Sequence, residues 1–141
     1  MGMLCKLSSR LLLKHPAVPG RTFSKFADVV EEVEDANSRG KGQFRVLKTP
    51  DKGYGVFAER SFSAGDLCFS SKPLEILQSR DSHSVQVSWT SHVHMDLPGR
   101  FINHCCTANV GILNNASGAF DFFALENIQQ GDELLWGKDE L

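Results

Sequence analysis

The sequence predicts a mainly β domain (α+β at most) that spans residues 42–141 and is built from short strands. Two observations lead to this prediction. From Phe44 onward, apolar residues recur with a period of two or form short apolar runs, as they do in strands. Clusters of Gly, Pro, Asp and Ser separate these runs at short intervals. A chain of 141 residues has room for one such domain and a short tail.

The strands and turns can be placed in order along this domain. Phe44 and Val46 alternate with polar neighbours and predict a first strand, which a turn at residues 50–53 ends. Three short apolar runs predict further strands at residues 56–58, 67–69 and 120–125, with turns at 63–66 and 129–132. No pattern typical of a long amphipathic helix interrupts them.

Composition excludes several classes of function. The chain is 41% hydrophobic and 23% charged, and its formal net charge of −2 provides no positive field for a phosphate backbone. We therefore expect no direct nucleic-acid binding. Because the chain contains no run of about 18 apolar residues, we expect no membrane span. Tyr54 is the single tyrosine, against ten phenylalanines, and this bears on the chemistry below.

The first 27 residues are basic and contain no acid. Lys6, Arg10 and Lys14 are spaced by four and would form one stripe of a helix that Pro16 ends. This composition predicts an organelle transit peptide, and therefore a mitochondrion or plastid. Without targeting, the same segment is a disordered tail on a cytoplasmic or nuclear protein. Residues 28–41 become acidic and then rich in Asn, Ser and Gly, which predicts a short helix or a linker.

Three stretches of the chain together resemble a known family. The first is residues 53–58 (GYGVFA). The second, residues 100–109 (RFINHCCTAN), resembles R-F-x-N-H-S-C-x-P-N, with Cys105 for the serine and Ala108 for the proline. The third, residues 122–136 (FFALENIQQGDELLW), resembles F-F-A-x-R-D-I-x-x-G-E-E-L-x-Y. In this order they resemble the SET domain, in a minimal form without a zinc-binding extension.

The resemblance implies a β-clip type fold, a cofactor and a substrate. In the family, the closing segment tucks under the loop after the second motif and forms a pseudoknot that builds the active site. SET domains transfer a methyl group from S-adenosyl-L-methionine to a protein or peptide lysine, whose amine has a free pKa of about 10.4 and must first lose its proton. The residues that the resemblance assigns to the cofactor are Gly53, Tyr54, Gly55, Arg100, Asn103, His104 and Trp136.

The sequence departs from the family at the tyrosine that orients the lysine amine. Counting from Trp136, Gly137 stands at the position of the acid and Lys138 at that of the tyrosine. The catalytic residue is therefore unknown from the sequence. Three interpretations stay open: another group orients the amine, catalysis is weak, or the domain only binds a peptide or the cofactor.

Four further features of the sequence each support a smaller prediction about metal binding, substrate recognition or targeting. Cys106 matches a zinc ligand of some relatives, but the partner cysteines are missing, so we expect no metal there. His92 and His94 would share one face of a strand, which without a well-spaced third ligand favours a polar strand over a metal-dependent oxygenase. The insert at residues 70–99 would shape substrate recognition. The final KDEL tetrapeptide is interpreted as coincidental.

Overall fold

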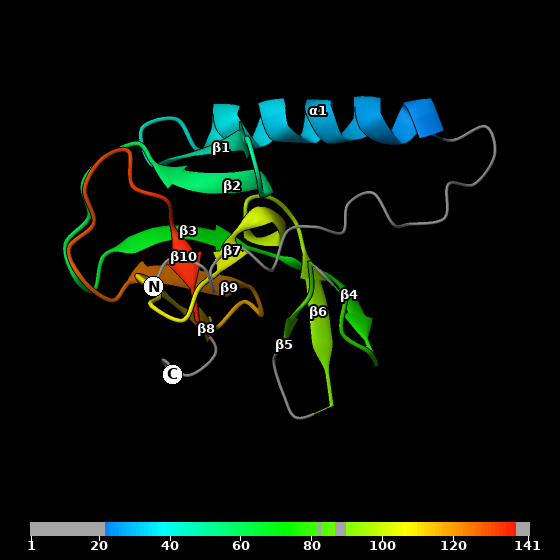
Figure 1. Cartoon of the computed structure of the whole chain (residues 1–141). Helices are drawn as coiled ribbons and strands as arrows, with labels where there is room; N and C mark the ends of the chain where they lie inside the picture. The colour runs from blue at the N-terminus through cyan, green and yellow to red at the C-terminus, as the bar shows by residue number, and fades with distance from the viewer. Residues whose placement is uncertain (1–21, 82, 87–89, 138–141) are drawn as a thin grey trace.

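The computed structural model describes residues 22–81, 83–86 and 90–137, and this part of the chain is mainly β, as the sequence predicts (Figure 1). Its strands form three sheets. Within the described residues, no helix is long and apolar enough to cross a membrane. The elements are α1 (Thr22–Arg39), β1 (Phe44–Thr49), β2 (Gly53–Ala58), β3 (Leu67–Ser71), β4 (Pro73–Leu77), β5 (Val85–Gln86), β6 (His92–Met95), the 3-10 turn η2 (Gly99–Phe101), β7 (Asn103–His104), β8 (Val110–Asn114), β9 (Phe120–Ala124) and β10 (Leu135–Trp136).

The first two strands form an antiparallel ribbon. Phe44 and Val46 point into the core, and their neighbours point to solvent, as the period of two predicts. The predicted turn at residues 50–53 joins β1 to β2, and Gly53 takes a φ of 71°, a conformation that favours glycine. The ribbon therefore places the glycine stretch at its turn and along β2.

The five-stranded sheet contains the feature that defines the topology. Its strand order is β3-β9-β8-β10-β7, so β10 lies between two strands that precede it in the chain. β10 is parallel to both: Leu135 pairs with Asn103, and Trp136 pairs with His104 and Val110. Threading a segment beneath a loop that joins two earlier strands is rare in proteins. This arrangement confirms the threaded closing segment that the resemblance implies.

A three-stranded sheet lies within the insert at residues 70–99, where the sequence analysis placed only the polar strand with His92 and His94. Its order is β4-β6-β5, and β4 is an edge strand with Leu74 and Ile76 largely exposed. On β6, His92 and His94 share the half-buried face, whereas Val93 and Met95 are buried. The sheet extends away from the rest of the fold (Figure 1).

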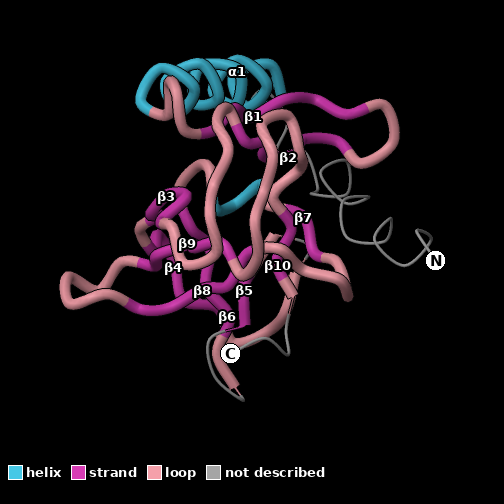
Figure 2. The backbone as a smooth tube through the Cα atoms, turned by 90° about the vertical axis from the view of Figure 1, so that its left-hand side faces the viewer, coloured by secondary structure: helices cyan, strands magenta, loops and turns pink. Residues whose placement is uncertain are grey.

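Helix α1 crosses the segment boundary that the sequence predicted between residues 27 and 28. It begins at Thr22 and continues through the acidic segment, so this segment is helix and not linker. Val29, Val33 and Ala36 follow a helical spacing and pack on the core, where Ala36 is 0% exposed. The acidic composition of this segment hid that spacing. In Figure 2, α1 lies above the β1–β2 ribbon, which lies above the five-stranded sheet.

The predictions about the two chain ends fall mostly on residues that the structure does not describe. Most of the predicted transit peptide and all of the KDEL tetrapeptide, whose first residue is Lys138, lie outside the described residues.

Candidate functional site

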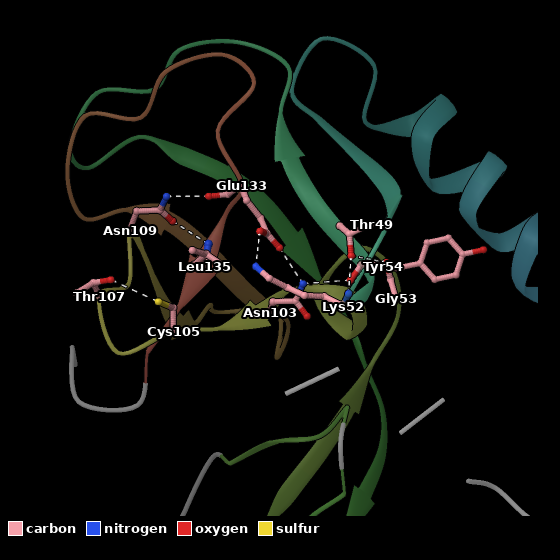
Figure 3. A network of polar contacts seen from close by, with 10 residues as sticks. All are labelled: Thr49, Lys52, Gly53, Tyr54, Asn103, Cys105, Thr107, Asn109, Glu133 and Leu135. Atoms are coloured by element: carbon pink, nitrogen blue, oxygen red, sulfur yellow. Dashed lines mark hydrogen bonds and ion pairs between the residues drawn. The ribbon is translucent and has the colours of Figure 1, made fainter. Parts of the chain in front are cut away.

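Three segments that are far apart in the sequence meet in one network of polar contacts (Figure 3). They are the β1–β2 turn with the start of β2, strand β7, and the closing segment from Glu133 to β10. Among the residues that the sequence assigned to a cofactor, Gly53, Tyr54, Gly55 and Asn103 lie in or beside this network. His104 and Trp136 lie next to it on β7 and β10.

Asn103 links strand β7 to the other two segments of the network. It is only 5% exposed, and its side-chain Nδ2 donates to two acceptors, Tyr54 O at 3.1 Å and Glu133 Oε1 at 2.8 Å. Both amide protons are therefore used inside the protein. The group that remains for a ligand is the acceptor Oδ1, which takes part in no hydrogen bond among the described residues.

Glu133 and Lys52 form an ion pair that sequence reasoning missed. Lys52 Nζ lies 2.9 Å from Glu133 Oε2, and each side chain is only 15% exposed. Thr49 orders the turn that carries Lys52: its hydroxyl donates to Gly53 O and accepts the Lys52 N–H. Glu133 stands at the second acid position of the third motif, and Lys52 directly precedes the first motif. Their position in or beside these motifs was the signal that could have identified them.

The missing side chain of Gly55 is what lets these segments approach. A Cβ on this buried residue would lie 2.7 Å from Glu133 Oε1 and 3.3 Å from Asn103 Nδ2. The sequence analysis linked the glycine pair to close approach by a cofactor. In the structure, the protein's own Glu133 and Asn103 occupy the space beside Gly55.

Asn109 holds the closing segment in place. Its Nδ2 donates to Glu133 O at 2.9 Å, and its Oδ1 accepts from the Leu135 N–H at 2.8 Å. Main-chain hydrogen bonds from Cys105 to Trp136 and from Asn109 to Leu135 reinforce this. Thr107 Oγ1 lies 3.4 Å from Cys105 Sγ within the same loop. The loop between β7 and β8 is thus fastened to the strand that passes under it.

Two half-buried rings continue the site along β7 and β10. His104 and Trp136 lie side by side, with ring centroids 5.2 Å apart and an interplanar angle of 79°. This edge-to-face contact places two aromatic rings next to each other where β7 pairs with β10.

Two predicted cofactor residues direct their side chains elsewhere. The Arg100 guanidinium pairs with Glu32 of α1 and also lies over the Phe101 ring, 5.2 Å from its centroid. The Tyr54 ring stacks on the same Phe101 ring, with the ring centroids 4.8 Å apart and an angle of 6° between the ring planes. Figure 3 shows the Tyr54 ring pointing away from Glu133. The assignment of Arg100 to the cofactor stays a prediction, and in the structure the charge of its side chain is matched by Glu32 of the acidic helix.

The histidines of β6 form a separate polar cluster. His94 Nε2 lies 2.5 Å from Asp81 Oδ2, and its Nδ1 lies 3.9 Å from Glu75 Oε2. Burial acts to raise the pKa of the Asp81 carboxyl, but hydrogen bonds from His83 N–H and from His94 outweigh it, so this pKa lies below its usual value. Within the described ranges, no three His, Cys, Asp or Glu side chains are placed to hold a metal ion.

Comparison with known proteins shows that this β domain has a methyltransferase-like fold. A family model described as the SET domain matches residues 53–137. The chain belongs to the SET-domain family. A crystal structure of a Plasmodium falciparum protein, described as a candidate histone methyltransferase, has a similar fold, with a TM-score of 0.54 and 17% identity over 72% of this chain and 96% of that one. A search of curated proteins found no match.

Proposed function

We propose that this domain binds S-adenosyl-L-methionine and transfers its methyl group to a protein lysine. The observation that supports this most is the threaded closing segment. Asn103 and Asn109, both from the second motif, hydrogen-bond to Glu133 and Leu135 of the third. In a SET-domain chain, these are the motifs that build the cofactor and lysine sites, and here they are joined.

The residues present fit the chemistry of this cofactor. Its amino-acid end carries an ammonium and a carboxylate, and Asn103 Oδ1 is an acceptor for the first. Lys52 and Glu133 add one cation and one anion beside Asn103. Trp136 offers an aromatic surface for an adenine. When bound, the cofactor would supply a methyl group on a positively charged sulfur.

The chain's own task would be to position a neutral lysine amine on one axis with that methyl group. No tyrosine hydroxyl is available for this among the described residues, because the Tyr54 ring stacks on Phe101 away from the network. This observation favours a second function, in which the domain binds the cofactor or a peptide without efficient turnover.

Binding and turnover can be separated by measuring both on one protein. We expect calorimetric titration with S-adenosyl-L-methionine or its demethylated product to give a micromolar dissociation constant, which corresponds to a binding free energy of about −8 kcal/mol. Asn103→Ala should weaken binding by about 1–3 kcal/mol, because a buried polar group loses its partner. Asn114→Ala, at an exposed position on β8, is the matched control and should bind as the wild type does.

The outcomes of this experiment distinguish the two functions. Methyl transfer from labelled cofactor to lysines of a protein extract, located by mass spectrometry, supports the methyltransferase. Binding without any labelled lysine supports the binding module. The absence of both heat and thermal shift at millimolar cofactor rejects both cofactor-dependent proposals.

A further inference from the structure

Helix α1 lies outside the part of the chain that matches the family model, yet it contacts both segments that border the candidate site. The match covers residues 53–137, and α1 ends at Arg39. One contact reaches the β1–β2 ribbon, and the other reaches the η2–β7 segment. These two segments meet at Asn103.

The contact with the ribbon is both apolar and polar. Asn37 uses both ends of its side chain on one residue of β1: Oδ1 accepts from the Val46 N–H at 2.6 Å, and Nδ2 donates to Val46 O at 3.0 Å. Ala36, beside it, is fully buried. β1 pairs along its length with β2, which carries Tyr54 and Gly55. The helix therefore holds β1, and the strand paired with it, β2, supplies one acceptor to Asn103.

The contact with η2 is an ion pair followed by a stack of rings. Glu32 Oε2 accepts from Arg100 Nη2, and Arg100 is only three positions before Asn103. The Arg100 guanidinium lies over Phe101, and Phe101 stacks in turn on Tyr54. Glu32, Arg100, Phe101 and Tyr54 form one continuous path from α1 to the residue whose carbonyl accepts from Asn103.

We propose that α1 clamps the ribbon and the η2–β7 segment together, with Glu32 as a positioning residue that acts through Arg100. The clamp sets the geometry of Asn103 and thereby the affinity for the cofactor. The affinity part rests on the proposed function, whereas the effect on Asn103 does not. Because the ion pair is partly exposed, we expect its removal to weaken cofactor binding by about fivefold.

The test compares two charge removals on the same helix. Glu32→Gln removes the pair with Arg100, and Asp35→Asn removes an exposed pair with Arg39 that faces no part of the site. Nuclear magnetic resonance of the Asn103 side-chain amide reports the clamp directly, because both of its protons are hydrogen-bonded. We expect faster amide exchange and a shifted resonance in Glu32→Gln, wild-type behaviour in Asp35→Asn, and recovery in the charge swap Glu32→Arg with Arg100→Glu.

Each outcome bears on a different part of the proposal. An unchanged Asn103 amide in Glu32→Gln overturns the clamp, as does an equal change in the two single variants. A changed amide together with a fivefold weaker cofactor supports the whole proposal. A changed amide in a protein that binds no cofactor in any variant keeps the clamp and rejects the proposed function.

Discussion

Glu133 joins three segments of the chain through three oxygen atoms. Its Oε1 accepts from Asn103, its Oε2 pairs with Lys52, and its main-chain oxygen accepts from Asn109. Gly55 leaves the space in which the carboxylate lies. At the scale of single residues, the candidate site is therefore a set of contacts around one acid, and we expect the removal of one partner to affect the others.

Gly55→Ala tests this dependence. The new Cβ would displace Glu133 from Lys52 and Asn103, so we expect a loss of about 1–3 kcal/mol in the free energy of unfolding. Denaturant unfolding measures this loss. Glu133→Ala removes the obstructing carboxylate, so the double variant should lose less than the sum of the single losses. Strictly additive losses would show that the two residues are not coupled.

The contact between Asp81 and His94 predicts a pH dependence. Because the pKa of the folded Asp81 lies below its usual 3.8, its stabilisation is fully present above that value and is lost as the pH falls through the folded pKa. Asp81→Asn should therefore be less stable than the wild type near neutral pH, and the difference should shrink in acid. Urea unfolding of the wild type and the variant, at neutral pH and in acid, measures the difference in stability. Asp51→Asn, at an exposed position, is the control. A pH-independent difference would contradict the assignment.

Strand β10 has only two residues, yet it completes the five-stranded sheet. Its main chain pairs with β7 and β8, and Asn109 supplies hydrogen bonds on either side of Leu134. Leu134 itself is fully buried. At the scale of elements, a short strand is thus held by one amide side chain and one apolar side chain in addition to its own ladder.

Asn109→Ala removes that amide support. It leaves Glu133 O and the Leu135 N–H without their side-chain partner, so we expect a loss of about 1–3 kcal/mol in stability. Hydrogen exchange should locate the loss in β10 and in the β7–β8 loop, with Asn114→Ala on β8 as the control. Exchange that accelerates evenly over the whole domain would contradict a local role for Asn109.

At the scale of the whole molecule, the proposed methyl transfer lacks the tyrosine that the resemblance implies, because Lys138 stands at its position. Losing one oriented hydrogen bond in a transition state costs about 100- to 1000-fold in rate. We therefore expect slow methyl transfer, and a faster rate on a permissive peptide after Gly137→Asp with Lys138→Tyr. Single-turnover assays with labelled cofactor measure both rates. A wild type that is already fast, with no gain from the double variant, would show that another group orients the amine.

Local patterns predicted the parts of this fold that depend on neighbours in sequence. The alternation at Phe44 and Val46 and the turns before β2 and β3 are local, and the structure contains them. The pair of Lys52 and Glu133 spans 81 positions, and no local pattern specifies such a contact. The sheet within residues 70–99 was predicted only at His92 and His94, because the pairing of β6 with β4 and β5 joins separate segments and no local pattern specifies it. The path from Glu32 to Arg100 is likewise long-range.

The position of β10 also has a consequence for how the domain assembles. The strands that flank it are made earlier, and neither can complete its ladder until residues 135–136 have been synthesised and inserted between them. Contacts between residues distant in sequence form slowly because a long loop must close first. We therefore expect Asn103 to reach its native surroundings in the last phase of refolding. A nascent chain would complete the network around Asn103 only after almost all of the family-matched segment has left the ribosome.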